Sequence, residues 1–221
     1  MSTPHRPRLQ LALDLLDIEP AVQLTRAVGD HVDVLEAGTI LILNRGLHVV
    51  ERLRAVWGKR PLVADVRIVE AGAIIADMAF SAGADVVTVF GGTSDTAIAS
   101  VAERARDHGK RVQIEVFEEW SYARAKLWRA LGIDELVLHR SRDAERDGIR
   151  AWGEADRTKI VRAAALGFEV SVTGGVTCDE LKTFAGLPVA GFIVGRAIGS
   201  HSDPAAAARA LQDAITATFG Q

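Results

Sequence analysis

The sequence lacks the features that mark secreted, membrane-spanning and disulfide-stabilised proteins. It contains one cysteine, Cys178, so no internal disulfide can form. No apolar run approaches the roughly 20 residues that a membrane-spanning helix needs. The opening stretch MSTPHRPRLQ contains no apolar signal-peptide core. We therefore expect a cytoplasmic protein.

A strong charge of either sign and low-complexity stretches are also missing. The formal net charge is −3 over 221 residues, with 48% hydrophobic and 25% charged residues, an ordinary balance for a soluble protein. No general attraction to nucleic acid or to anionic lipid is expected, so neither is predicted as a partner. Because nothing resembles a linker, we expect a single domain over residues 1–221, with residues 1–8 as a flexible N-terminal segment.

Short apolar runs alternate with amphipathic segments along the chain. The runs are rich in Val, Ile and Leu, as strands covered on both faces are. The segments between them have apolar residues every three or four positions, which is typical of helices, as at 95–108 and 156–167. Glycines in HGK and LGF follow these two segments, as helix C-caps do. The expected strands are 9–15, 32–38, 61–67, 85–91, 111–117, 135–141, 169–175 and 191–197.

This alternation predicts an α/β protein, a single (β/α)8 TIM barrel of eight strand–helix units. The chain is slightly shorter than the typical barrel of about 250 residues. The alternative is an open, doubly wound sheet. The number of strands favours the barrel.

Charged side chains gather near the carboxyl ends of the expected strands, which is where barrels of this kind place their catalytic residues. Carboxylates crowded at a barrel mouth repel one another, so a bound cation or cationic side chains must compensate. The oxygen ligands would suit Mg²⁺. For any single residue, an ordinary solvated strand end is the alternative. The carboxylates are Asp14, Glu36, Asp65 and Glu115, and the cations are Arg67, Arg142 and Arg196.

The seventh and eighth units end in the glycine-containing sequences VTGGV and VGRAI. Phosphate sites in these barrels usually lie after strands 7 and 8. Glycine lets backbone N–H groups approach an anion closely, and an arginine can donate two hydrogen bonds to it. We therefore predict a phosphate site at Gly174, Gly175, Gly195 and Arg196, with two tight turns and no ligand as the alternative.

One histidine, His139, falls where a strand leaves the core, between ELVL and RSRDA. An imidazole there suits general acid catalysis near neutral pH. The alternative is a structural histidine. Cys178 has no histidine partner in view, and a nucleophile role for it is not favoured.

Eight motifs occur in order between about residue 9 and residue 215. Together they resemble the 3-keto-L-gulonate 6-phosphate decarboxylase and hexulose-6-phosphate synthase group of the orotidine 5′-monophosphate decarboxylase suprafamily. The pair HRSRDA and AWGEAD is the most specific part. The motifs are LALDL, VDVLEAGT, VADVRIVEAG, VQIEVF, LVLHRSRDA, AWGEAD, VSVTGG and FIVGRAI.

The resemblance implies a Mg²⁺-dependent carbon–carbon lyase, generally dimeric, that acts on a phosphorylated keto-sugar acid. Loss of CO₂ would leave a 1,2-enediolate, which is protonated to a pentulose 5-phosphate. Carried over residue by residue, the resemblance assigns Glu36 and Asp65 to Mg²⁺, Asp14 and Thr173 to the substrate, Glu115, His139 and Arg142 to the intermediate and its protonation, and Gly174, Gly175, Gly195 and Arg196 to the phosphate.

The chain departs from the suprafamily motif Asp-x-Lys-x-x-Asp, which here reads Asp65, Arg67 and Glu70. In the family the cation stabilises the enediolate and the last carboxylate reaches across the dimer, so we expect a homodimer with Glu70 near its interface. Arginine stays protonated, which excludes a role in which this cation gives up a proton. Either the longer side chains keep an Arg67–Glu70 contact, or they mark a different substrate.

Two alternatives to decarboxylation follow from this departure. One is a hexulose-6-phosphate synthase-type aldolase that joins formaldehyde to ribulose 5-phosphate. The other is a diverged enzyme or a sugar-phosphate binder on the same barrel. Glu115, Arg142 and Thr173 match the decarboxylase branch, so the resemblance favours decarboxylation.

Overall fold

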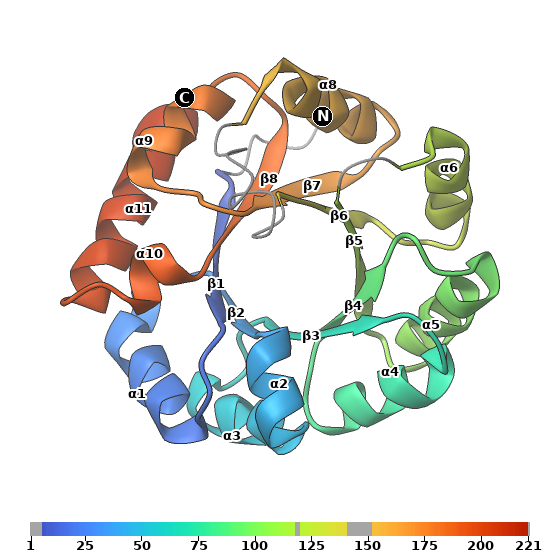
Figure 1. The fold of residues 1–221 in the computed structure, drawn as a ribbon, viewed down its shortest axis with the longest axis horizontal. Coiled ribbons are helices and arrows are strands. Elements are labelled where there is room, and N and C mark those ends of the chain that lie inside the picture. Colours follow the sequence, from blue (N-terminus) through green and yellow to red (C-terminus); the bar gives the residue numbers. More distant parts are fainter. Residues whose placement is uncertain (1–5, 118–119, 141–151, 221) are drawn as a thin grey trace.

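The structure, a computed structural model, describes residues 6–117, 120–140 and 152–220. Its parallel strands form a closed barrel in the order β1 to β8, and Figure 1 looks down this barrel. Closure comes from the pairing of β1 with β8, in register from Arg8 opposite Gly191 to Leu11 opposite Val194. The predicted single-domain (β/α)8 barrel is therefore confirmed, and an open sheet is excluded.

Most strands stop short of their predicted carboxyl ends. The predicted runs continued into residues such as Gly174 and Arg196, which lie beyond the last paired residue. These are pocket residues, so the overrun came from reading functional side chains as strand. The strands are β1 Arg8–Leu13, β2 Val34–Ala37, β3 Leu62–Ile68, β4 Val86–Phe90, β5 Arg111–Val116, β6 Glu135–His139, β7 Glu169–Thr173 and β8 Val189–Val194.

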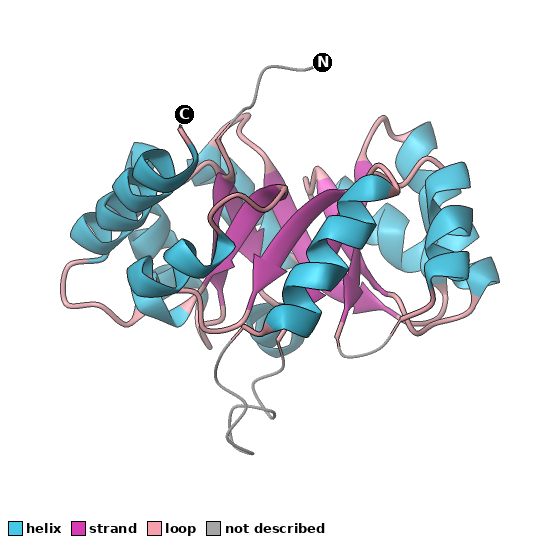
Figure 2. Cartoon of the chain, turned by 90° about the horizontal axis from the view of Figure 1, so that it is seen from above, coloured by secondary structure: helices cyan, strands magenta, loops and turns pink. Residues whose placement is uncertain are grey.

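Helices surround the strands on all sides (Figure 2). Sequence signals explain several helix ends: the Ser94 hydroxyl accepts a hydrogen bond from the Ala97 N–H at 3.1 Å, and Pro204 follows the cap residue Asp203. In the described ranges, no helix is both long and apolar enough to cross a membrane. The helices are α1 Ile18–Val28, α2 Thr39–Arg45, α3 His48–Trp57, α4 Gly72–Ser81, α5 Asp95–Asp107, α6 Tyr122–Ala130, α8 Glu154–Ala165, α9 Cys178–Leu181, α10 Arg196–Gly199 and α11 Pro204–Phe219, with 3₁₀ turns at Gly29–His31 and Lys182–Phe184.

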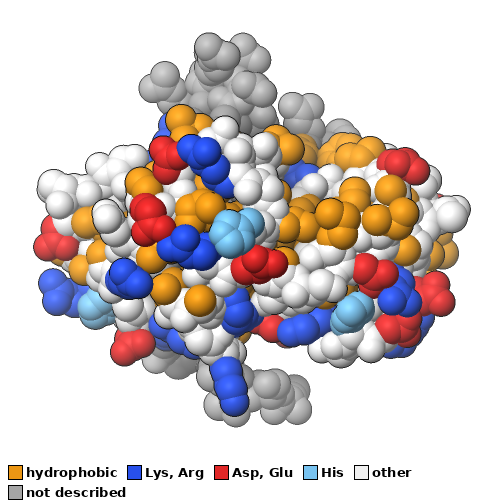
Figure 3. All heavy atoms as spheres, turned by 90° about the horizontal axis from the view of Figure 1, so that it is seen from below, with side chains coloured by type: hydrophobic (Ala, Val, Ile, Leu, Met, Phe, Trp, Pro, Cys, Tyr) orange, Lys and Arg blue, Asp and Glu red, His pale blue; other side chains and the backbone are white. Residues whose placement is uncertain are grey.

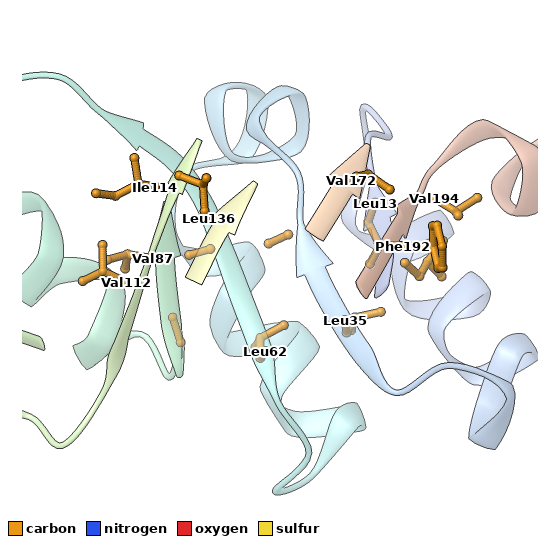
Figure 4. Close-up of a cluster of buried hydrophobic side chains, with 14 of the residues drawn as sticks. Leu13, Leu35, Leu62, Val87, Val112, Ile114, Leu136, Val172, Phe192 and Val194 are labelled. Atoms are coloured by element: carbon orange, nitrogen blue, oxygen red, sulfur yellow. The ribbon is translucent and has the colours of Figure 1, made fainter. Parts of the chain in front are cut away.

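The main core lies between the strands and the helices (Figure 4). Every strand contributes fully or almost fully buried apolar side chains to it. Each such side chain stabilises the fold by about 1.5–3 kcal/mol. They include Leu13, Leu35, Leu62, Val87, Ile114, Leu136, Val172 and Phe192.

The inside of the barrel is mainly polar. A small separate cluster of Val34, Val63 and Val86 is its apolar part. Barrel interiors are usually filled by branched apolar residues. Buried polar groups must find partners or ligands, so this interior is built around specific interactions. The polar residues are Gln10, Glu36, Asp65, Thr88, Gln113, Glu115, Glu135 and Ser171.

The N-terminal prediction needs a correction. Arg6 donates two hydrogen bonds of 2.9 Å to the Asp33 carboxylate, Pro7 is buried, and Arg8 begins β1. A flexible segment over residues 1–8 is therefore wrong for residues 6–8, because an ion pair and strand pairing hold them. Residues 1–5 lie outside the described residues.

Candidate active site

A pocket of about 750 Å³ opens at the carboxyl ends of the strands. All but two of the predicted site residues line it. Glu70 is exposed on the β3–α4 connection and does not line the pocket, and Arg142 lies outside the described residues. The predicted residues that line the pocket are Asp14, Glu36, Asp65, Arg67, Glu115, His139, Thr173, Gly174, Gly175, Gly195 and Arg196.

Two buried carboxylates, Glu36 on β2 and Asp65 on β3, are held by hydrogen bonds. They are 7% and 3% exposed. The hydroxyls of Thr39 and Thr88 donate to the two oxygens of Asp65 at 2.5 and 2.7 Å. The Gln10 amide donates to Glu36 Oε2 at 2.5 Å. These donors fix the orientation of both carboxylates toward the pocket.

The negative charge around Glu36 is costly in the protein alone. Burial raises the pKa of the Glu36 carboxyl well above its ordinary value, and the charges of Asp65, Asp14 and Glu115 raise it further, against the hydrogen bond from Gln10. A bound cation would relieve both effects, because it favours the ionised carboxylates.

The donor set fits Mg²⁺ only as a partial site. Within the described part of the chain, no group of three His, Cys, Asp or Glu side chains is arranged to hold a metal. Mg²⁺, however, usually takes one or two carboxylates and completes its octahedron with water and substrate oxygens. Glu36 and Asp65 suit that arrangement.

Arg67 is the cation among these carboxylates. Its Nε lies 2.9 Å from Glu115 Oε2 and 3.3 Å from Asp65 Oδ2. Burial alone would lower the pKa of Arg67, but Asp65, Glu115 and Glu36 outweigh burial and raise it. Among the described residues Arg67 makes no ion pair with Glu70, so the contact considered from the motif is not formed.

The backbone at Arg67 is irregular. Its φ is +43°, in the left-handed region, and the register of β3 against β4 shifts between Ala64 and Ile68. The Arg67 N–H donates to the Thr88 hydroxyl at 2.9 Å, which supports this conformation. A non-glycine residue there costs on the order of 1–3 kcal/mol. Irregular strand ends of this kind re-aim side chains, and here Arg67 lines the pocket while Ile68 stays in the core.

His139, the last residue of β6, is paired with Glu115 of β5. Its ring nitrogen Nδ1 is hydrogen-bonded to Glu115 Oε1. The other ring nitrogen, Nε2, has no partner in the described part of the chain and remains available to a ligand. Thr173 of β7 lies directly opposite His139 in the barrel register. Its hydroxyl donates to the carbonyl of Ile193 at 3.2 Å.

Glycines form the wall after β7 and β8, across the barrel from β3 (Figure 1). Gly174 has φ +102°, and a Cβ there would overlap the carbonyl oxygen of Arg140. Gly195 and Arg196, at the start of α10, line the same wall. A surface of backbone N–H groups beside a guanidinium suits a phosphate dianion.

Several pocket residues were missed from the sequence. Thr39 stands directly after the strand-end motif VLEAG, and Gln10 interrupts the apolar run of β1. Both are signals of an inward-facing polar role. Phe117 also lines the pocket and carries no such signal. The partners of these side chains lie on neighbouring strands, so local patterns do not reveal them.

Comparisons with known proteins agree with this geometry. The family described as "Orotidine 5'-phosphate decarboxylase / HUMPS family" matches residues 7–211. The curated 3-keto-L-gulonate-6-phosphate decarboxylase UlaD of Escherichia coli O139:H28 is 39% identical over 214 residues, 97% of this chain and 99% of that protein.

Solved structures agree as well. KGPDC from Streptococcus mutans, in a ribose 5-phosphate complex, has a TM-score of 0.94 and 36% identity, over 98% of this chain and 100% of that one. A 3-hexulose-6-phosphate synthase has a TM-score of 0.83 and 34% identity, over 94% and 99%. By their names these relatives are decarboxylases and synthases, which agrees with the predicted carbon–carbon lyase. The chain belongs to the orotidine 5′-phosphate decarboxylase/HUMPS family.

Proposed function

We propose that this protein is a Mg²⁺-dependent lyase that decarboxylates a 3-keto sugar-acid phosphate to a pentulose 5-phosphate. The substrate is 3-keto-L-gulonate 6-phosphate or a close analogue. One observation carries the proposal: a single pocket combines a glycine wall suited to phosphate with two buried carboxylates, a permanent cation and a carboxylate-paired histidine. The 39% identity to a 3-keto-L-gulonate-6-phosphate decarboxylase over nearly the whole chain supports it.

Binding starts from the phosphate. The N–H groups of the glycine wall and the guanidinium of Arg196 hold the phosphate at the β7–β8 side of the pocket. The other end of the substrate then extends toward Arg67 and His139. Binding energy from the phosphate, which does not react, orients the reacting carbons.

The bond that breaks joins the carboxylate carbon to C2. Its electron pair moves toward the C3 carbonyl, CO₂ leaves, and a 1,2-enediolate (in product numbering) remains. Arg67, fixed by Glu115 and Asp65, stabilises the negative charge that develops on the enediolate oxygens. Mg²⁺, when held by Glu36 and Asp65, supplies Lewis-acid stabilisation of the same charge.

The carbon that lost CO₂ then takes up a proton. His139 is the group suited to supply it, directly or through a water, because Glu115 holds Nδ1 and leaves Nε2 for the pocket. The Glu115 carboxylate also stabilises the protonated imidazole. Thr173, opposite His139 in the barrel register, lies beside the substrate.

The test is to incubate the purified protein with Mg²⁺ and 3-keto-L-gulonate 6-phosphate in D₂O. We expect CO₂ release and one solvent deuterium in the pentulose phosphate. The matched control is His139→Asn, which we expect to slow turnover while binding of the product phosphate persists. If the wild-type protein releases no CO₂ and incorporates no deuterium, the decarboxylase proposal is wrong.

A second candidate is the aldolase reaction of the synthase relatives, favoured by the 34% identity to a 3-hexulose-6-phosphate synthase. Here the enediolate of ribulose 5-phosphate would add to formaldehyde instead of taking up a proton. Mg²⁺-dependent condensation of these two compounds without decarboxylase activity would establish it. Thermal stabilisation by sugar phosphates without either turnover would indicate a binding protein.

We also propose a homodimer with Glu70 near its interface. Exposed apolar side chains flank Glu70: Val69 beside it, Ile74 and Met78 on α4, and Leu43 on α2. Figure 3 shows hydrophobic side chains on the face that carries α1 to α4. Sedimentation velocity should show a dimer that Ile74→Glu converts to a monomer, whereas Val161→Glu on the distant α8 should leave it dimeric. A wild-type monomer would contradict the proposal.

A further inference from the structure

An aromatic side chain, Phe117, stands in the pocket beside the polar groups. It comes two residues after Glu115, so both face the inside of the barrel while the intervening Val116 packs in the core. An apolar ring at this place does not bind a metal, a phosphate or a proton. Its contacts indicate what it does.

Phe117 touches two of the charged groups of the pocket. Its ring stacks on the imidazole of His139, with centroids 4.8 Å apart and 22° between planes. The guanidinium carbon of Arg67 lies 5.7 Å from its centroid. Behind it, Phe90 packs at 6.0 Å and 57°. Phe117 is thus supported on one side and holds His139 and Arg67 on the other.

The two constraints on His139 are of different kinds. The hydrogen bond from Glu115 fixes one atom, Nδ1, but leaves the ring free to tilt about that contact. The stacked face of Phe117 fixes the plane of the ring. Together they fix the direction of Nε2. Aromatic faces also attract cations within about 6 Å, so the same ring favours Arg67 and a protonated imidazole where they lie.

We propose that Phe117 is a positioning residue, which sets the plane of His139 and the place of Arg67 for the protonation of the enediolate. This inference rests on the proposed function. Glu115 cannot replace Phe117 in this role, because a single hydrogen bond does not define a plane. A proton donor that tilts is no longer aimed at one face of a planar enediolate.

The test compares Phe117→Leu, which keeps an apolar side chain without a ring, with Phe117→Tyr, which keeps the ring. We expect Phe117→Leu to lower kcat about tenfold with little change in KM, a part of the roughly 10²–10⁴-fold that a positioned acid contributes. In D₂O the wild type should place deuterium mainly in one of the two hydrogen positions of the new CH₂OH group. Phe117→Leu should give a mixture, and Phe117→Tyr should restore the wild-type pattern.

Phe90→Leu is the matched control, because Phe90 touches Phe117 but does not line the pocket. Its kcat and labelling pattern should remain close to wild type. Equal losses in Phe117→Leu and Phe90→Leu would reduce Phe117 to general packing and overturn the proposal. So would identical labelling in wild type and Phe117→Leu.

A second readout does not depend on turnover. The ring C–H resonance of His139, assigned by its loss in His139→Gln, should carry a ring-current shift from Phe117. Phe117→Leu should remove that shift, and Phe117→Tyr should keep it; an unmoved resonance in Phe117→Leu overturns the positioning role. Absence of wild-type turnover would instead refute the proposed function, so the two failures are distinguishable.

Discussion

The two ends of this barrel treat buried acids differently. At the amino ends of the strands, Glu135 accepts hydrogen bonds from Arg111 and Gln113, and Asp85 accepts from Arg54, Lys110 and the Leu62 N–H. At the carboxyl ends, the carboxylates of Asp14, Glu36, Asp65 and Glu115 line one pocket. Among the described residues, Arg67 and Arg196 are the arginines that line it with them.

The difference separates charge that stabilises the fold from charge that is kept for a ligand. A buried acid with a full set of donors adds to folding, whereas crowded carboxylates that share one cation repel one another. The raised pKa of Glu36 records that cost. Such local conflicts are typical of functional sites, which a bound cation and substrate complete.

The largest effect is expected from Glu36→Gln at the carboxyl end. We expect kcat/KM with Mg²⁺ to fall on the order of 10³-fold, because one of two proposed metal ligands is lost. The melting temperature without metal should not fall, since a destabilising buried charge is removed. Removal of Mg²⁺ with EDTA should abolish wild-type activity reversibly. A variant that keeps its activity, or that loses stability as well, would break the contrast between the two ends.

The next largest effect is expected at the amino end, from Glu135→Leu. This change leaves Arg111 and the buried Gln113 without their carboxylate, so the free energy of unfolding should drop by about 2–4 kcal/mol. The activity of the folded variant should stay close to wild type. Urea unfolding and steady-state kinetics measure the two quantities. A large loss of kcat without a loss of stability would contradict the assignment of this end to folding.

Arg67→Lys should have a smaller effect. Lysine keeps the charge but has no planar fork to bridge Glu115 and Asp65, so we expect kcat/KM to fall about tenfold. Arg67→Met removes the charge and should fall by at least a further tenfold. If lysine and methionine are equally poor, the shape of the guanidinium matters more than its charge.

The smallest effect concerns acid stability at the amino end. Burial alone would raise the pKa of Asp85, but hydrogen bonds from Lys110, the Leu62 N–H and Arg54 outweigh it and lower the pKa. A carboxyl whose folded pKa is depressed stabilises the protein above its unfolded pKa, about 3.9, and loses that contribution as the pH falls through the folded value.

Asp85→Asn should therefore cost about 1 kcal/mol at neutral pH, and its difference from wild type should shrink below about pH 4. Unfolding in urea at a series of pH values measures this. A difference that stays constant from pH 7 to pH 3 would show that the Asp85 charge contributes nothing.

Individual residues show how far prediction from sequence reaches. Glu36 and Asp65 were found because a charge at the end of an apolar run is conspicuous, and strand ends meet at one mouth of the barrel. Glu70 looked like a site residue from its motif, yet it is exposed outside the pocket. Phe117 was overlooked, because its position in the sequence resembles an ordinary strand end.

The sequence by itself determined the barrel, its single domain and most of the pocket. Alternating periodicity and the rule that active sites lie at carboxyl strand ends are local properties of the chain. Tertiary structure alone decided the partners: Arg67 between Asp65 and Glu115, His139 between Glu115 and Phe117, and Asp65 between two threonine hydroxyls. The physical reason is that a strand pattern fixes the face on which a side chain lies. Only closure of the barrel fixes which side chains from other strands it meets.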